Sequence, residues 1–147
     1  MKPSDVLNLR DLYAKRGQLN LWLKNWQGAI ADYTNSLARA EGSVSASVYA
    51  ERAEAYTALG EYDNAINDYT SAVRVISEQI QAAPTQEERE AQSSNAMSYF
   101  EKSAALNLKL GNDVAARNDL ESAFAIAVAL NDEESAARIQ NLINGLN

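Results

Sequence analysis

The stretch "WQGAIADYTNSL" at residues 26–37 decides the fold, because the chain repeats it. Residues 62–73 read "YDNAINDYTSAV", so both copies have an aromatic residue followed by x-x-Ala-Ile-x-Asp-Tyr-Thr, 36 residues apart. The agreement extends upstream, where Tyr13 and Tyr49 each stand 13 residues before the aromatic residue of their copy. An internal repeat of this length predicts stacked structural units, each of which packs against its neighbour.

A third, weaker copy begins at Phe100. Its small and apolar residues keep the offsets of the second copy: Ala104, Gly111, Ala116, Leu120 and Ala123. The whole chain has only two prolines and six glycines, a composition that favours helices over a β-sandwich or barrel. Three copies of a two-helix unit therefore predict an all-α repeat fold.

The repeat resembles the tetratricopeptide repeat (TPR), a helix–turn–helix unit of about 34 residues. The second copy matches that pattern best, with motif residues Tyr49, Ala53, Tyr56, Gly60, Tyr62, Ala65, Tyr69 and Ala72. Small residues such as Gly17 and Ala53 let the paired helices approach, and Tyr33, Tyr69 and Leu120 fill the space between them. The resemblance covers about residues 10–130 and implies a right-handed solenoid of helical hairpins with about seven helices.

Some positions depart from the family pattern. The leucine expected before the small residue is replaced by Arg16, Arg52 or Ser103 in the three copies. The tyrosine expected later in the first helix is replaced by Asn20 and Asn107 in copies one and three. The closing proline is missing from every copy. All of these positions concern the packing of helices within the repeats.

The interval between the second and third copies is 51 residues instead of 36. The additional sequence is helix-forming apart from Pro84, and Thr85-x-x-Glu88 directly after it is a capping-box pattern. Two prolonged helices would then project as a hairpin, unless the length is only a tolerated insertion. We predict one TPR-like domain over residues 1–147: repeat 1 at about 10–42, repeat 2 at about 46–83 with an extended second helix, and repeat 3 at about 86–130 with an extended first helix.

A capping helix is predicted after the third copy, at about residues 133–144. Asp132 stands at its start, and Gly145 closes it. Its apolar residues recur at helical spacing: Ala136, Ile139, Leu142 and Ile143. The last repeat of a solenoid needs such a helix, because its open face is otherwise apolar.

Composition excludes much of enzyme chemistry. Cysteine and histidine are both absent, so the chain forms no disulfide, no thiolate or imidazole metal site and no histidine general base. Carboxylates are plentiful, but no sequence motif marks two of them as an acid–base pair. We predict a protein that is not an enzyme and binds no cofactor and no metal.

The net charge of −7 disfavours a nucleic-acid partner, because phosphate binding needs clustered Lys and Arg. The longest apolar run, "AFAIAVAL" at residues 123–130, is too short for the roughly 20 residues that span a bilayer. No basic and then apolar leader opens the sequence. We therefore expect a cytoplasmic protein without an integral membrane segment.

The resemblance further implies a scaffold whose concave groove, lined by the first helix of each repeat, binds a peptide or helix of a partner protein. Carried over residue by residue, the groove has Asp11 and Ser47 beside this set: Lys15, Gln18, Leu21, Trp22, Glu51, Glu54, Glu101, Lys102 and Lys109. Its basic flanks and acidic middle favour a partner with a basic centre. The alternative is that these are ordinary solvated side chains.

One subgroup of the family binds the C-terminal carboxylates of chaperones through a clamp of Lys, Asn and Arg. The clamp positions fall here on Ala14, Gln18, Glu51, Ser98 and Lys102, which include one basic residue. Glu51 would repel a carboxylate. We therefore do not predict an adaptor for chaperone tails.

A second surface is predicted on the first helix. Leu9, Leu12, Leu19 and Leu23 share a face with Arg16, the face that in an inner repeat packs against the preceding one. Soluble monomers seldom leave such apolar patches bare. The alternative function is therefore a structural assembly unit that forms homo-oligomers through this edge or through the extended hairpin.

Overall fold

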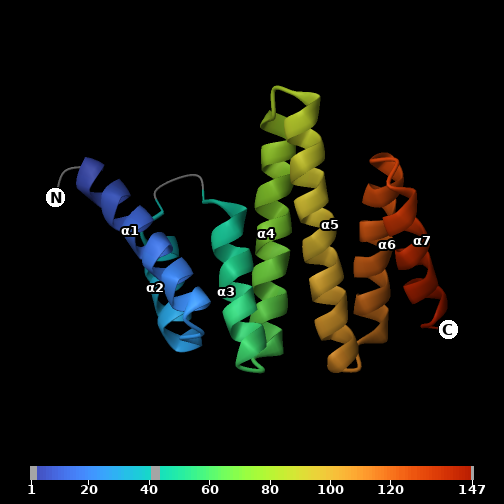
Figure 1. The fold of residues 1–147 in the computed structure, drawn as a ribbon, viewed down its shortest axis with the longest axis horizontal. Helices are drawn as coiled ribbons and strands as arrows, with labels where there is room; N and C mark the ends of the chain where they lie inside the picture. The colour runs from blue at the N-terminus through green and yellow to red at the C-terminus, as the bar shows by residue number, and fades with distance from the viewer. Residues whose placement is uncertain (1–2, 41–43, 147) are drawn as a thin grey trace. The chain divides into compact units, whose positions relative to one another are not determined.

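The computed structural model describes residues 3–40 and 44–146, with side chains described from Leu9 onward. These residues form seven α-helices and no strand (Figure 1), which confirms the predicted all-α fold. The helices are α1 Pro3–Trp22, α2 Trp26–Ala38, α3 Ala46–Ala58, α4 Tyr62–Ala82, α5 Gln86–Lys109, α6 Asp113–Ala129 and α7 Glu133–Asn144.

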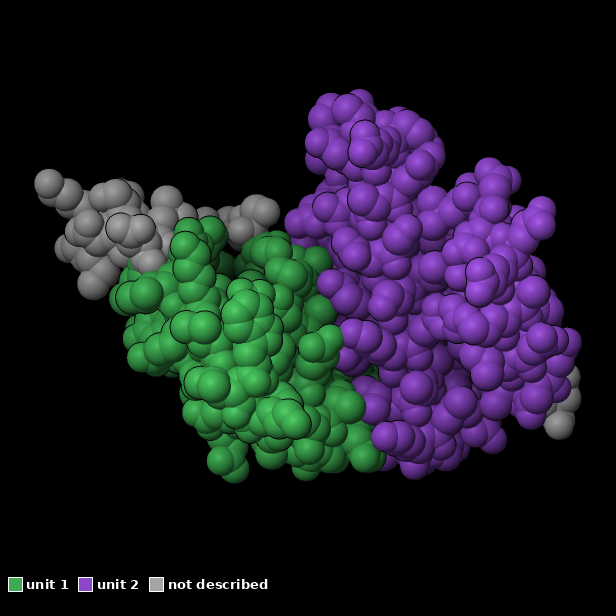
Figure 2. Space-filling view, in the orientation of Figure 1, with its two compact units in different colours: residues 1–68 green, residues 69–147 purple. Residues whose placement is uncertain are grey.

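The chain divides into two compact units, residues 1–68 and residues 69–147, with the boundary inside α4 (Figure 2). Each unit is described by itself. The predicted division into three repeats of a single domain stays a prediction, and the expected end of repeat 1 at residue 42 lies outside the described residues.

Four of the short turns, those of α1–α2, α3–α4, α5–α6 and α6–α7, each contain one residue with a left-handed backbone. These residues are Lys24 (φ 57°), Gly60 (φ 78°), Gly111 (φ 74°) and Asn131 (φ 55°). Glycine adopts this conformation without a steric penalty, whereas lysine and asparagine have a Cβ atom that disfavours it. The same turn geometry therefore recurs along the chain even where the glycine has been replaced.

The break between α4 and α5 lies where the sequence pattern placed it. α4 ends at Ala82 and α5 begins at Gln86. The Thr85 hydroxyl accepts a hydrogen bond from the backbone N–H of Glu88 at 3.2 Å, which confirms Thr85 as the N-cap of α5. The Arg89 guanidinium donates to the carbonyl of Ala83 at 2.9 Å, which helps to close the turn. Within residues 69–147, the connected ends of α4 and α5 reach beyond α6 (Figure 1).

In the unit of residues 1–68, α2 packs between α1 and α3. Its core is a cluster of Ala29, Tyr33 and Ala55, each with no exposed surface. A Cβ atom at Gly17 would lie 2.9 Å from Cε1 of Tyr33. The predicted close approach of a small residue of α1 to Tyr33 of α2 is therefore confirmed.

In the unit of residues 69–147, α6 packs against both α5 and α7. Its core cluster contains Ala104, Ala116, Leu120, Ala123, Ala127, Ile139 and Ile143. Tyr69 of α4 stacks on Tyr99 of α5, with ring centroids 6.0 Å apart. Ile139 and Ile143 attach α7 to this core, whereas Leu142 on the same helix is 47% exposed.

The start of α7 is stabilised by Asp132. Its carboxylate accepts a hydrogen bond from the backbone N–H of Ser135 at 3.0 Å, as expected for an N-cap. Hydrogen bonds from Ser135 lower the pKa of Asp132 below its ordinary value. Because the folded-state pKa is lowered, this stabilisation is present above the unfolded-state pKa and is lost as the pH falls through the folded-state pKa.

Substitutions of Asp132 test this capping charge. Asp132→Asn keeps an oxygen acceptor but removes the charge, so at neutral pH it should be less stable than the unmodified chain. Urea denaturation should show that this difference shrinks as the pH falls through the lowered pKa of Asp132. Asp132→Ala lacks the acceptor and should be less stable than Asp132→Asn at neutral pH. A difference between Asp132→Asn and the unmodified chain that does not change with pH would contradict the assignment.

Candidate functional site

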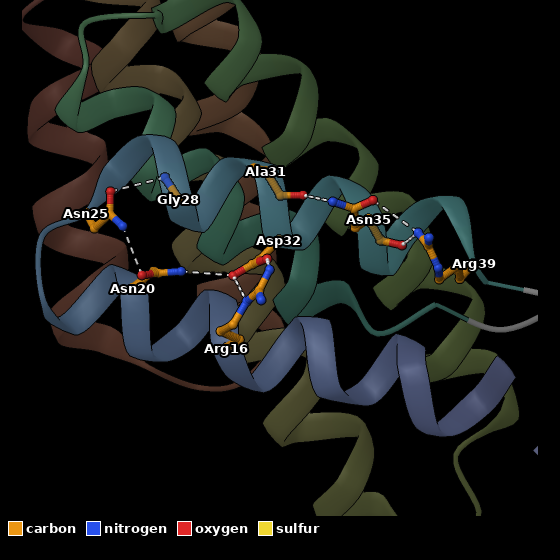
Figure 3. A network of polar contacts seen from close by, with 8 residues as sticks. All are labelled: Arg16, Asn20, Asn25, Gly28, Ala31, Asp32, Asn35 and Arg39. Atoms are coloured by element: carbon orange, nitrogen blue, oxygen red, sulfur yellow. Dashed lines mark hydrogen bonds and ion pairs between the residues drawn. The ribbon is translucent and has the colours of Figure 1, made fainter. Parts of the chain in front are cut away.

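One aspartate position is shared by the three sequence copies, and the structure shows what binds it. In the first copy, Arg16 Nε donates to Asp32 Oδ2 at 2.8 Å, and Asn20 Nδ2 donates to the same oxygen at 2.9 Å (Figure 3). Asn20 also accepts from Asn25, which caps α2 through the backbone N–H of Gly28. A buried carboxylate is thus held by two side chains of α1.

The second copy repeats the pair with a more deeply buried arginine. Arg52 Nε and Nη2 each donate to one carboxylate oxygen of Asp68 at 2.7 Å. The exposed fractions of the two side chains are 16% and 7%. Burial alone would lower the pKa of Arg52, but the hydrogen bonds and the charge of Asp68 raise it. Arg52 Nη1 also donates to the hydroxyl of Thr34 at 2.9 Å, which connects α3 to α2.

In the third copy, Ser103 replaces the arginine, and Asn107 Nδ2 donates to Asp119 Oδ2 at 3.0 Å. The arginines and asparagines that depart from the family pattern therefore share one structural role: each binds the aspartate in the second helix of its repeat. The sequence analysis did not predict these contacts with the aspartate. The signal was available, because Arg16 and Asp32 are separated by the same 16 residues as Arg52 and Asp68.

A hollow of about 240 Å³ lies beside α1 and α3 in the unit of residues 1–68. Its lining includes Asp11, Lys15 and Ser47, all of which the family resemblance assigned to the groove. Ala14 and Val48 add apolar surface. The hollow can therefore accommodate an apolar side chain next to a cationic group and a hydroxyl group.

Other predicted groove residues of this unit differ in accessibility. Trp22 is 71% exposed, Glu54 is exposed and Gln18 is half-buried. Leu21 is half-buried and packs against the cluster of Ala29, Tyr33 and Ala55. Of these two neighbours, Trp22 is therefore the more accessible apolar side chain.

Glu51 already has a partner within its unit. Its Oε2 atom accepts a hydrogen bond from the Tyr33 hydroxyl at 2.5 Å. Burial, together with this hydrogen bond and the charge of Glu51, raises the pKa of Tyr33 well above its ordinary range. Tyr33 therefore stays protonated, and its hydrogen bond to the Glu51 carboxylate connects α2 to α3.

The predicted groove residues of the other unit have contacts of their own. Arg138 of α7 donates two hydrogen bonds to the carboxylate of Glu101, one of them from Nη2 to Oε1 at 3.0 Å. The ammonium of Lys102 lies 5.9 Å from the ring centroid of Tyr69, within the range of a cation–π interaction. Lys109 stands exposed in the last turn of α5. The charge of Glu101 is thus balanced by the last helix.

Two further properties bear on function. Among the residues with described positions, no group of three or more acidic, histidine or cysteine side chains is arranged to hold a metal ion. In the same part of the chain, no helix has both the length and the apolar character needed to cross a membrane.

Comparison with known proteins identifies the fold. No family model matches the sequence, and no curated protein sequence matches it. The TPR2B domain of yeast Sti1, solved as a complex with pHsp70, is 20% identical with a TM-score of 0.65, and the match covers 93% of this chain and 94% of that one. The TPR domain of Arabidopsis OM64 is 16% identical with a TM-score of 0.67, over 95% of this chain and 98% of that one. The chain therefore has the TPR fold that its repeat motif predicted.

Proposed function

We propose that this chain is a non-enzymatic protein–protein interaction module that binds a peptide or helix of a partner protein on the face of α1 and α3. The hollow beside these two helices carries the proposal, because Asp11, Lys15 and Ser47 all line it. The yeast Sti1 domain with the same fold was solved as a complex with pHsp70, which supports the use of this fold for binding another protein. The absence of cysteine and histidine agrees with a binding role.

The charges of the face indicate how a partner segment would bind. Glu51 and the exposed Glu54 both belong to α3, so basic side chains of the partner are expected against that helix. Lys15 at the hollow favours an acidic or carbonyl group there. Trp22 supplies a large exposed aromatic surface, the residue type that most often dominates the energy of protein interfaces.

The binding of Glu101 by Arg138 changes the expected charge pattern. A carboxylate that is already held by a guanidinium attracts a basic ligand less strongly, because the ligand has to compete with the internal partner. The cytoplasmic location and the absence of a nucleic-acid partner stay predictions.

The proposal can be tested with peptides selected from a displayed random library against the immobilised chain. Trp22→Ala should weaken binding of the selected peptides by about 10- to 100-fold, and Lys15→Glu should weaken binding of those with an acidic group. Leu142→Ala, which truncates an exposed leucine of α7, is the matched control and should leave binding unchanged. Selected peptides that bind both α1 variants as tightly as the unmodified chain would refute the proposal.

A further inference from the structure

A row of leucines runs along α1 outside the hollow. Leu9, Leu12, Leu19 and Leu23, here named the α1 stripe, are separated by three, seven and four residues, with Arg16 in the gap. This is the spacing of the contact positions of a helix that packs lengthwise against another helix. Leu12, Leu19 and Leu23 are 61%, 54% and 77% exposed. The chain thus presents a helix-packing face that is open to solvent.

The second sequence copy shows what such a face binds. The residues of α3 that stand 36 positions after Leu12 and Leu19 are Val48 and Ala55. Ala55 has no exposed surface, and Val48 packs against the same cluster, which includes Ala29 and Tyr33 of α2. At these two positions α3 is therefore covered by a helix with an aromatic and alanine stripe, whereas Leu59, the counterpart of Leu23, is 36% exposed.

The charges of α1 indicate which kind of helix the α1 stripe would bind. Residues 9–24 contain four basic side chains, Arg10, Lys15, Arg16 and Lys24, and one acidic side chain, Asp11. Because Arg10, Asp11 and Lys15 line the hollow, Arg16 and Lys24 are the charged residues beside the α1 stripe. The Arg16 side chain is 63% exposed even though it binds Asp32. Symmetric pairing of two copies through this face would bring like charges together, whereas a helix with acidic flanks would be complementary.

We propose that the α1 stripe is a docking surface for an acidic amphipathic helix of a partner protein, separate from the hollow beside α1 and α3. The partner helix would place small and aromatic side chains between the leucines, as α2 does on α3. Its acidic residues would lie next to the basic side chains of α1. This surface would let the chain hold two segments at once, which a groove alone does not provide.

Two peptides cut from the chain itself are suitable probes. Residues 61–76, "EYDNAINDYTSAVRVI", contain three acidic side chains and one basic, whereas residues 25–40, "NWQGAIADYTNSLARA", contain one of each. Both carry the aromatic-x-x-Ala-Ile stripe. Because helices of this length are marginal in water, each peptide is stapled on its polar side. The acidic peptide should bind the intact chain about tenfold more tightly than the neutral one at low salt, and added salt should reduce that advantage.

Variants locate the binding. Leu19→Glu should weaken binding of the acidic peptide by about tenfold or more, and the milder Leu19→Ala should weaken it by less. Leu142→Glu, at an exposed leucine of α7, should have no effect. Far-UV circular dichroism checks that each variant folds, and peptides selected for the hollow should bind Leu19→Glu normally.

Three outcomes would overturn the proposal. The first is that neither peptide binds at about millimolar concentration. The second is that the Leu19→Glu variant binds the acidic peptide as tightly as the unmodified chain. The third is a stable dimer of the chain alone, found by light scattering, that Leu19→Glu dissociates. In that case the surface belongs to a second copy of the chain.

Discussion

Arg52→Met is expected to lower the free energy of unfolding by about 3–5 kcal/mol, because it leaves a buried carboxylate without its cation. The side chain of Asp68 is 7% exposed, and both of its oxygens accept hydrogen bonds from Arg52. Water cannot replace the guanidinium at such a position without opening the contact between α3 and α4. Thr34 loses a hydrogen bond as well. Urea denaturation followed by far-UV circular dichroism measures the change.

Two comparisons make this prediction specific. The double variant Arg52→Met with Asp68→Leu removes both charges and should recover much of the loss, because an apolar pair often replaces a buried ion pair without cost. Arg16→Met should destabilise less than Arg52→Met, since Arg16 is exposed and Asn20 continues to bind Asp32. A loss for Arg52→Met no larger than that for Arg16→Met would contradict the prediction.

The sequence predicted those features of the fold that depend on local periodicity. Small residues at matching offsets in the copies predicted the close approach of Gly17 and Tyr33 that the structure shows. Capping chemistry located the starts of α5 and α7, because the side chain of an N-cap binds its own backbone three residues away. These interactions are decided within one or two turns of chain, so one sequence is enough to infer them.

Contacts between distant residues were harder to predict. Arg16 and Asn20 depart from the family pattern, which is defined mainly by apolar and small residues and therefore does not predict their contacts with Asp32. The binding of Glu101 by Arg138 joins residues 37 positions apart, so only the packing of α7 reveals it. Neighbouring residues of a helix point about 100° apart, so Leu21 packs partly against the core while the adjacent Trp22 is exposed.

Ile139→Ala is expected to lower the free energy of unfolding of the α7 region by about 2–5 kcal/mol. Ile139 has no exposed surface and belongs to the core cluster that contains Leu120 and Ala127 of α6. Truncation removes buried methyl groups and leaves a cavity that the rigid neighbouring helices fill only in part. Leu142→Ala is the matched control, because Leu142 is 47% exposed and its truncation should change stability by less than about 0.5 kcal/mol.

Hydrogen exchange shows how far this damage extends. α7 is joined to the rest of its unit by Ile139 and Ile143, by the Arg138–Glu101 pair and by a hydrogen bond from Arg117 to the carbonyl of Leu146. With Ile139 truncated, the amides of α7 should exchange much faster, while those of α5 and α6 should change less, because a terminal helix can open without unfolding its neighbours. Equal acceleration in α5, α6 and α7 would instead show that α7 and its neighbours unfold as one cooperative unit. If Leu142→Ala accelerated the amides of α7 as much as Ile139→Ala, the buried face of α7 would be wrongly assigned.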